Sequence, residues 1–352
     1  MTRTRRLEEL LGIQAPIVLG PFGGLSSVEL TAAVSNLGGL GSYGLYGHAP
    51  ERIRETVQAL HAATGRPFAV NLWLPTGDEV DPVDADLDAA IGAVAPFFAE
   101  LGIDVPPVPA RFLPDIDEQL ETVFEARPAA VSLVYGVPPA RFVERAHSVG
   151  IRVIGTATTV EEAVALEAGG ADAIVATGFE AAGHRVSFLA PAEQSLVGTI
   201  ALVPQVVDAV TIPVVAAGGI GDRRGVAAAF ALGASGVQVG TAFLRTRQSA
   251  APDAHRQAIS HSPAHGTVLT RAMSGRPARG IPNRAVTTIE QQRAIARFPA
   301  QNWLTGQFRA EAARQDQGEL LSLWAGQAAA LSRSAEAGEV FAELAAGVPD
   351  GH

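Results

Sequence analysis

The chain has 352 residues, no cysteine and a formal net charge of −10; 47% of its residues are hydrophobic. This composition supplies a large core and excludes extensive disorder, disulfides, thiolate metal sites and a cysteine nucleophile, while the acidic balance argues against nucleic-acid binding. All 26 basic residues are arginines, and the absence of lysine excludes Schiff-base enzymes and P-loop kinases.

Short apolar runs recur along the chain, each followed by a turn and a helical stretch. The eight candidate strands are Pro16–Gly20, Gly39–Tyr43, Phe68–Leu74, Ala129–Tyr135, Ile151–Ala157, Ala171–Thr177, Ile212–Ala217 and Gly236–Val239. Because the runs are apolar almost throughout, both faces of each strand should be buried, as in a parallel sheet. Eight such units predict an α/β fold of the closed (β/α)8, or TIM barrel, type, with an open doubly wound sheet as the alternative.

Two helices have clear start signals. The segment Thr159–Glu162 has the pattern of a capping box and predicts a helix that ends at Ala168. Asp222 predicts the start of a helix that ends at Leu232.

Two segments depart from the repeat and define the predicted domains. Residues 1–250 form the barrel, and residues 76–115, rich in Pro and Asp, form an insertion after strand three with a helix over Asp86–Leu101. Residues 251–352 form a helical C-terminal extension with a loop at Ser274–Asn283, and we expect it to pack on the barrel, over its mouth.

No targeting or membrane segment is predicted. The start of the chain has arginines but no apolar signal-peptide region. Gly225–Leu244 is uncharged over 20 residues, yet its glycines and polar residues favour a buried helix, a turn and a buried strand over a membrane span. We therefore expect a cytoplasmic protein without membrane contact; a homodimer is compatible with this expectation.

The carboxyl ends of the strands carry the candidate site, as in other barrels of this type. Strand seven ends in Gly218, Gly219 and Gly221, and strand eight is followed by Gly240 and Thr241. Backbone amides in such loops bind phosphate without a basic side chain, so these loops predict a phosphate site. Glycines that only permit tight turns are the alternative.

A second glycine motif, Gly39-x-Gly41-x-x-Gly44, matches the dinucleotide-binding pattern in spacing alone. That motif must follow a strand and open a helix, whereas here a helical segment precedes it. We interpret these glycines as structural.

His184, after Gly178-Phe-Glu-Ala-Ala-Gly183 at the mouth of strand six, is the ionisable group best placed for chemistry. Histidine can act as a base near neutral pH, although a loop histidine bonded to the backbone is an equal alternative on position alone. No histidine pair has metal-ligand spacing with supporting carboxylates, so no metal is predicted.

Several segments in order resemble the nitronate monooxygenase family, formerly called 2-nitropropane dioxygenases. The matching segments are Ala15–Val18, Ala33–Gly41, Pro67–Leu72, Val131–Gly136, Gly155–Thr159, Gly178–His184, Ala216–Ile220 with Asp222, Gln238–Leu244, Ser274–Gly280 and Ala325–Gln327. The resemblance implies non-covalent FMN, an alkyl nitronate or nitroalkane as substrate, and O2 as oxidant, with a carbonyl compound and nitrite as products. It also implies that His184 faces the substrate, as a base or as an orienting group.

The resemblance further implies the cofactor contacts. The FMN phosphate lies on the two glycine-rich loops with Gln238 nearby, while Asn71 and the backbone of residues 21–23 hold the isoalloxazine. The implied cofactor-binding residues are Pro21, Phe22, Gly23, Asn71, Thr177, Gly178, Gly183, Gly218, Gly219, Gln238, Gly240 and Thr241.

This chain departs from the family pattern around the flavin. Leu19-Gly-Pro-Phe22 replaces the usual Gln-Ala-Pro-Met, Thr177 replaces a glutamine, and Ala182 replaces a common glycine. These changes alter the flavin face and the pocket wall, and so concern the substrate more than the cofactor.

Two other functions remain open at this point. One is an FMN enzyme reduced by NAD(P)H that acts on quinones or enoyl thioesters. The other is a flavin-binding barrel without turnover, against which the position of His184 argues.

Overall fold

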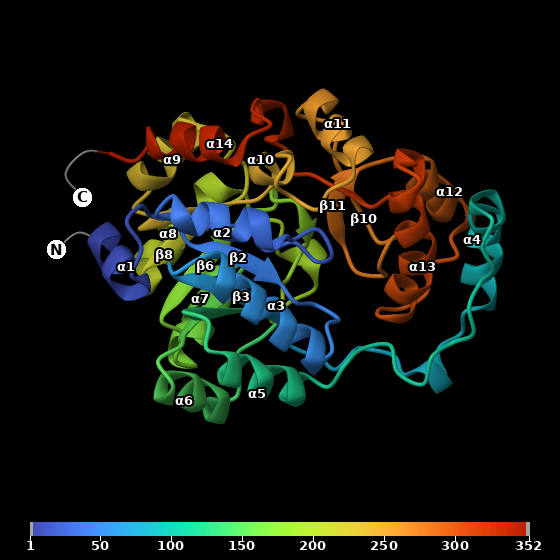
Figure 1. The fold of residues 1–352 in the computed structure, drawn as a ribbon, viewed down its shortest axis with the longest axis horizontal. Helices are drawn as coiled ribbons and strands as arrows, with labels where there is room; N and C mark the ends of the chain where they lie inside the picture. The colour runs from blue at the N-terminus through green and yellow to red at the C-terminus, as the bar shows by residue number, and fades with distance from the viewer. Residues whose placement is uncertain (1–2, 350–352) are drawn as a thin grey trace.

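Eight parallel strands form the barrel in the computed structural model, which describes residues 3–349 (Figure 1). They are β1 (Ile17–Leu19), β2 (Gly41–Gly44), β3 (Phe68–Trp73), β4 (Ala130–Val134), β5 (Arg152–Ala157), β6 (Ala173–Thr177), β8 (Val214–Ala217) and β9 (Gly236–Val239). The strand order is β1-β9-β8-β6-β5-β4-β3-β2, and a parallel bridge between Val18 and Leu40 joins the two ends. The sheet is therefore a nearly closed TIM barrel, as predicted, and not an open sheet.

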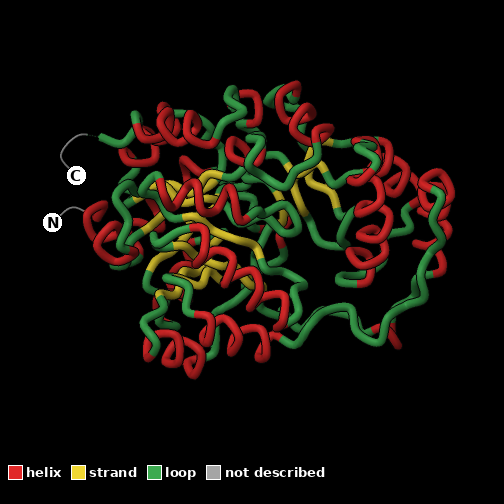
Figure 2. Tube along the Cα trace, in the orientation of Figure 1, coloured by secondary structure: helices red, strands yellow, loops and turns green. Residues whose placement is uncertain are grey.

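Helices surround this sheet, as the tube view shows (Figure 2). They are α1 (Arg3–Leu11), α2 (Val28–Asn36), α3 (Pro50–Ala63), α5 (Ile116–Ala126), α6 (Ala140–Ser148), α7 (Val160–Ala168), α8 (Thr199–Ala209) and α9 (Arg223–Ala231). Their apolar faces pack on strands that are buried on both sides, which explains the continuous apolar runs of the sequence.

The last helix of the chain belongs to the barrel. After β9 only the short α10 (Thr241–Leu244) follows, so the outer layer lacks a full helix between α9 and α2. Helix α14 (Ala337–Ala345) fills this position and buries Val340 and Phe341 in the same core as Leu30 and Val226. The end of the predicted extension thus completes the hydrophobic core of the barrel.

The insertion and the rest of the extension form a second hydrophobic cluster beside the barrel. Helix α4 (Asp88–Leu101) lies at the right edge of Figure 1, against α12 (Arg284–Gln292) and α13 (Ala300–Arg314). Phe97 and Phe98 of α4 contact Phe308 of α13 with ring centroids 5.5 and 5.8 Å apart. The other elements of this region are α11 (Asp253–His261) and the 3-10 turns at Pro82–Asp84 and Gly318–Leu320. Two further 3-10 turns lie at Ala192–Gln194, in the loop after β6, and at Ala329–Leu331, before α14.

A small antiparallel sheet that the sequence analysis did not predict joins the extension to the barrel. Its strands are β7 (Gly183–His184), β10 (Val268–Thr270), β11 (Ala278–Ile281) and β12 (Leu323–Trp324). The prediction of a loop over Ser274–Asn283 is wrong where β11 lies. The strands of this sheet have two to four residues each and gain their partners only in the tertiary structure, so their apolar patterns are too short to detect.

The structure also settles two local predictions. Gly41 lies in β2, where an added Cβ atom would clash with the Thr31 backbone oxygen, so this glycine permits close packing of α2 on β2. The segment Gly225–Leu244 contains most of α9, a turn and β9, as expected, and also the short helix α10, which was not predicted. No helix within residues 3–349 has the length and hydropathy to cross a bilayer.

Both helix caps form, but the capping box forms only in part. Thr159 accepts a hydrogen bond from the Glu162 amide, and Asp222 accepts one from the Arg224 amide. The Glu162 carboxylate does not return to Thr159. It is fully buried and accepts bonds from the Thr158 amide and hydroxyl, both at 2.7 Å, and from the Phe188 amide at 2.6 Å. One carboxylate therefore joins the end of β5 to the segment that follows β7.

Replacing Glu162 with Gln should destabilise the protein by about 2–4 kcal/mol, because an amide NH2 cannot accept from these donors and leaves buried groups unpaired. The measurement is the free energy of unfolding by urea. E161Q, on the exposed face of the same helix, is the matched control and should change stability by less than about 0.5 kcal/mol. Equal effects of the two substitutions would contradict this role for Glu162.

Candidate active site

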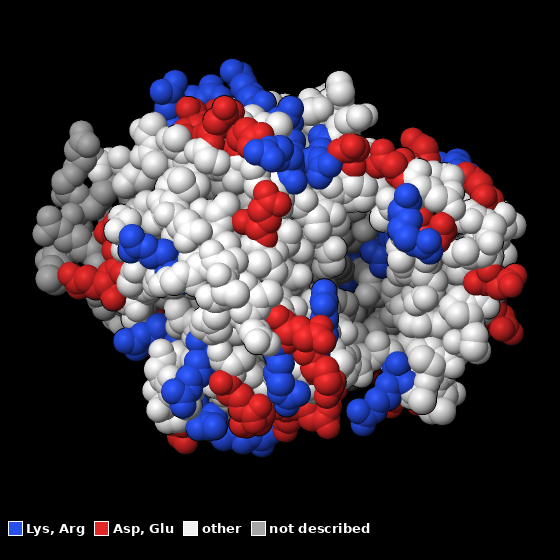
Figure 3. Space-filling view, in the orientation of Figure 1, with Lys and Arg blue, Asp and Glu red and all other residues white. Residues whose placement is uncertain are grey.

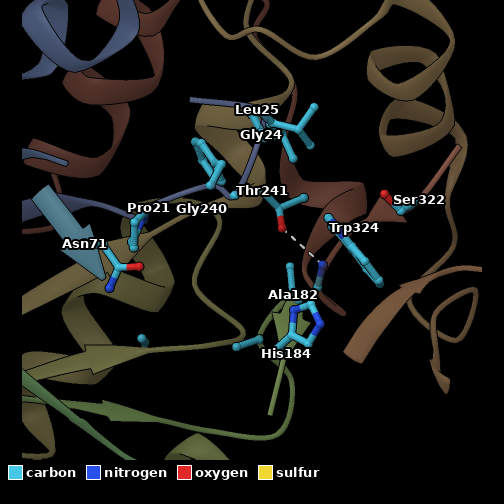
Figure 4. Close-up of a pocket in the computed structure, with 18 of the residues that line it drawn as sticks. Pro21, Gly24, Leu25, Asn71, Ala182, His184, Gly240, Thr241, Ser322 and Trp324 are labelled. Atoms are coloured by element: carbon cyan, nitrogen blue, oxygen red, sulfur yellow. Dashed lines mark hydrogen bonds between the residues drawn. The ribbon is translucent and has the colours of Figure 1, made fainter. Parts of the chain in front are cut away.

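A cavity of about 500 Å³ lies at the carboxyl ends of the barrel strands, where the barrel meets the extension. Figure 4 shows Pro21 and Asn71 from the barrel on one side and Ser322 and Trp324 from the extension on the other, with His184 below them. The space-filling view shows the molecule hollowed between these two parts, with acidic and basic side chains interspersed on that face (Figure 3).

The structure brings almost all of the predicted site residues together. The predicted residues that line the cavity are Pro21, Phe22, Gly23, Asn71, Thr177, Gly183, His184, Gly218, Gly219, Gln238, Gly240 and Thr241. Gly178 does not line it. An added Cβ atom there would lie 2.0 Å from the Thr199 hydroxyl, so Gly178 allows the loop to pack closely against the start of α8.

The loops after β6 and β8 form the glycine-rich end of the cavity. Gly218 and Gly219 have positive φ angles of 102° and 70°, which turn the backbone sharply after β8. The carboxylate of Glu180 accepts bonds from the Thr199 amide and hydroxyl, and that hydroxyl lies 3.0 Å from the Gly218 oxygen. The loops after β6 and β8 are thereby held together.

Ser332 also lies at the glycine-rich end of the cavity, and it was not predicted from the sequence. It is 5% exposed and lines the cavity, and its hydroxyl has no hydrogen-bond partner among the described residues. Buried hydroxyls are normally paired, so an unpaired one at a glycine-rich loop is typical of a site that binds a polar ligand. No sequence signal identifies it, because it lies in the extension, about 90 residues after Thr241.

Asn71 presents an acceptor to the cavity. Its amide nitrogen donates to the Ser132 hydroxyl at 2.8 Å and to the Ser132 carbonyl at 3.1 Å. Since a carbonyl can only accept, the nitrogen must face Ser132, and the amide oxygen is the atom left for a ligand.

His184 is held on three sides. Its backbone pairs with Ala278 of β11, and its Nε2 atom lies 2.8 Å from the Ser274 hydroxyl. The imidazole packs edge-on against Trp73, with centroids 4.8 Å apart, and lies 5.5 Å from the ring of Trp324.

The imidazole of His184 is neutral at physiological pH. Burial lowers its pKa from 6.5 to about 3, and the positive charges of Arg276 and Arg309 lower it further in the same direction. A neutral imidazole has one lone pair and accepts a proton only weakly at this pKa.

Arg309 is a partly buried cation that lines the cavity and has no acidic partner in the described part of the chain. Its guanidinium donates to the Ser322 hydroxyl at 2.9 Å and to the Asn302 side-chain oxygen at 2.8 Å, while Nε has no partner. Burial lowers its pKa to about 10, which still leaves it charged at neutral pH. An unpaired buried charge is costly, so this part of the cavity is suited to an anion.

The positive charge of Arg276, by contrast, is balanced by two carboxylates. It lies between the rings of Tyr135 and Phe298, at 4.6 and 3.9 Å from their centroids, and donates to Glu79 of the insertion at 2.7 Å. Asp78 pairs with it as well. This cluster connects the insertion to the loop before β11. Arg276 and Arg309, like Ser332, were not predicted as site residues, because all three lie in the extension.

The comparisons with known proteins agree over almost the whole chain. The family model described as nitronate monooxygenase matches residues 4–347. A nitronate monooxygenase of Pseudomonas aeruginosa is 42% identical, with 97% of this chain and 98% of that protein covered. The structure is similar to that of a nitroalkane oxidase from Streptomyces ansochromogenes (TM-score 0.87, 36% identity, 97% of each chain). It is also similar to FabK from Thermotoga maritima (TM-score 0.74, 29% identity, 96% and 94% of the two chains).

Two histidines with lowered pKa values should make the protein sensitive to acid. Burial lowers the pKa of His184 to about 3 and that of His255, on α11, to about 4. In the unfolded chain both take up protons near pH 6.5, so between pH ~6.5 and ~4 the unfolded state binds more protons and stability falls as the pH falls. Each group contributes a slope of up to about 1.4 kcal/mol per pH unit.

The measurement is urea unfolding at several pH values in this window. H184N and H255N should each reduce the slope, because asparagine does not titrate. A slope that neither substitution changes would show that these imidazoles are protonated in the folded protein.

Proposed function

The chain belongs to the nitronate monooxygenase family of flavin-dependent oxidoreductases that act on nitronates, and from this premise we propose that it uses FMN and O2 to convert an alkyl nitronate into a carbonyl compound and nitrite. The observation that carries the choice of substrate is the unpaired cation Arg309 in the wall of the cavity that contains His184. A nitronate is an anion, whereas its parent nitroalkane is neutral.

We propose that Arg309 binds the nitro oxygens of the substrate. A guanidinium whose remaining partners are the neutral groups of Asn302 and Ser322 keeps its full charge for a ligand. The lowered pKa of His184 supports the same choice, because a weak base is poorly suited to remove a proton from a neutral nitroalkane. Substrate that arrives already deprotonated avoids this difficulty, and His184 then orients the carbon end.

The residues of the cavity fit FMN. We propose that the backbone of Gly218, Gly219 and Gly240 and the hydroxyl of Ser332 bind the phosphate, and that the oxygen of Asn71 accepts from the isoalloxazine. When bound, the flavin supplies the redox chemistry between nitronate and oxygen. Thr241 contributes indirectly, since its hydroxyl accepts from the Gly326 amide at 3.0 Å and so holds the extension at this end (Figure 4).

The extension covers the reacting end of the cavity. Trp324 flanks His184, and the Gly326 backbone approaches the loop after β6 so closely that an added Cβ atom would lie 2.8 Å from the Glu180 oxygen. Closure of this kind limits access of water to the substrate. The cytoplasmic location and the homodimer stay predictions.

Anaerobic reduction tests the proposed substrate. The purified protein, loaded with FMN, should lose its visible flavin absorbance when ethyl nitronate is added without O2, and should keep it with NADH or NADPH. Bleaching by a nicotinamide alone would establish instead a reductase for quinones or enoyl thioesters. A protein that takes up no flavin at all would contradict the cofactor assignment.

R309M is the variant arm of the same experiment. The loss of a charge-assisted hydrogen bond should raise the nitronate concentration needed for half-maximal reduction by about tenfold to a hundredfold. R314M, on the same helix with its side chain 74% exposed, is the matched control and should leave that concentration unchanged. Similar values for wild type and R309M would exclude Arg309 from substrate binding.

Ser332 provides a separate test of the phosphate position. S332A should raise the Kd for FMN about tenfold, because a hydrogen bond to a charged group is lost. The Kd can be measured from flavin fluorescence during titration of the apoprotein. S148A, at the exposed end of α6, is the control. An unchanged Kd in S332A would place the phosphate elsewhere.

A further inference from the structure

Ser274 lies beside His184 although it is 90 residues away in the chain. It belongs to the loop before β11, is 1% exposed, and its hydroxyl oxygen is 2.8 Å from Nε2 of His184. Since this oxygen contacts three polar groups, the position of its single proton decides which nitrogen of the imidazole carries hydrogen.

The neighbours of the hydroxyl determine where that proton lies. The Arg276 amide donates to the Ser274 oxygen at 3.3 Å, and the Ser274 hydroxyl donates to the Arg276 carbonyl at 3.1 Å. Among the described residues nothing else donates to that carbonyl. If the hydroxyl instead donated to His184, the buried Arg276 carbonyl would lose its only donor, at a cost of about 1–3 kcal/mol.

The arrangement that satisfies every group therefore has Nε2 of His184 as a donor. Its N–H bonds to the Ser274 oxygen, whose lone pairs accept from Nε2 and from the Arg276 amide. Because the imidazole is neutral, Nδ1 then carries no hydrogen. Nδ1 has no hydrogen-bond partner in residues 3–349, and His184 lines the cavity.

We propose that Ser274 is a positioning residue that holds His184 in the Nε2–H tautomer, so that the Nδ1 lone pair faces the substrate. The nitrogen assignment rests on the hydrogen bonds of Ser274 and on the neutral imidazole, whereas the identity of the substrate that meets Nδ1 rests on the proposed function. A lone pair repels the nitronate oxygens, so the carbon end of the substrate lies toward Nδ1 and the oxygens lie toward Arg309.

The same assignment fixes how a neutral nitroalkane reacts, although the low pKa of His184 makes this step slow compared with the reaction of a nitronate. Its α-carbon proton passes to Nδ1, and the electron pair of the broken C–H bond moves to the nitro group, which yields the nitronate anion and an imidazolium. No oxidant is needed for this step. The other tautomer, with hydrogen on Nδ1, has no lone pair at this position and cannot accept the proton.

The tautomer can be observed directly in the flavin-loaded enzyme labelled with 15N-histidine. Long-range 1H–15N correlation spectra distinguish a nitrogen that carries hydrogen from one that does not, and H184N identifies the signals of this residue. We expect a protonated Nε2 and an unprotonated Nδ1 in the wild type. S274A should give a mixture of tautomers, and S274T, which keeps the hydroxyl, should restore the wild-type pattern.

Kinetics give a second readout. S274A should lower kcat/KM for nitroethane about tenfold, because proton abstraction needs the Nδ1 lone pair, with a smaller loss for ethyl nitronate. S274T should recover most of the nitroethane rate. Equal losses for the two substrates would indicate a merely structural role and overturn the proposal.

The two proposals can fail separately. A wild-type spectrum with hydrogen on Nδ1 overturns the role of Ser274 whatever the activity, and this readout does not depend on whether S274A folds. The expected tautomer in an enzyme that reduces its flavin only with NADH would instead overturn the proposed substrate and leave the assignment of His184 intact.

Discussion

The backbone pairing of Gly183 and His184 with Ala278 and Arg279 joins the loop after β6 to the C-terminal extension. A loop that leaves a barrel strand has no partner of its own, and here two residues of antiparallel pairing supply one. The imidazole of His184, the hydroxyl of Ser274 and the ring of Trp324 come together at this pairing. The candidate active site therefore lies at the junction of the barrel and the extension.

Two carboxylates, the buried Glu162 and the partly buried Glu180, hold the barrel side of this junction together. Glu162 binds the segment that follows β7 to the end of β5, and Glu180 binds the same long loop to the start of α8. Each carboxylate accepts hydrogen bonds from backbone amides that would otherwise be unpaired. Such charge-assisted hydrogen bonds are stronger than neutral ones and so stabilise these loops. Trp73 of β3 then supports His184 through a ring contact rather than a hydrogen bond, so both polar atoms of the imidazole stay available, one for Ser274 and one for the cavity.

The two arginines near His184 have different roles because only one of them is paired with carboxylates. Arg276 is paired with Asp78 and Glu79, so it serves to connect the insertion with the extension. Arg309 has only neutral partners, and its charge is directed to whatever the cavity binds. Both cations disfavour protonation of His184. A neutral imidazole beside an unpaired cation suits an anionic substrate that needs orientation more than deprotonation.

The sequence by itself determined the barrel and the barrel half of the site. Continuous apolar runs, helix caps and glycine-rich strand ends are local patterns, and they correctly predicted the eight strands, the position of His184 and the loops that meet around Gly218 and Gly240.

The tertiary structure alone decided the other half of the site. Ser274 lies in a segment that resembles the family but suggests no role for it, and Arg309 and Ser332 lie where the sequence has no local signal. Their significance comes from the folded chain: Ser274 contacts an imidazole 90 residues away, Arg309 has no counter-charge, and the Ser332 hydroxyl is unpaired at the glycine-rich end of the cavity. The position of helix α14 was likewise decided by the tertiary structure. It packs between α9 and α2 because the short α10 leaves an apolar face of the barrel uncovered after β9. Local propensity acts over a few residues, whereas desolvation and hydrogen-bond satisfaction depend on every neighbour in space, and only the folded chain specifies those neighbours.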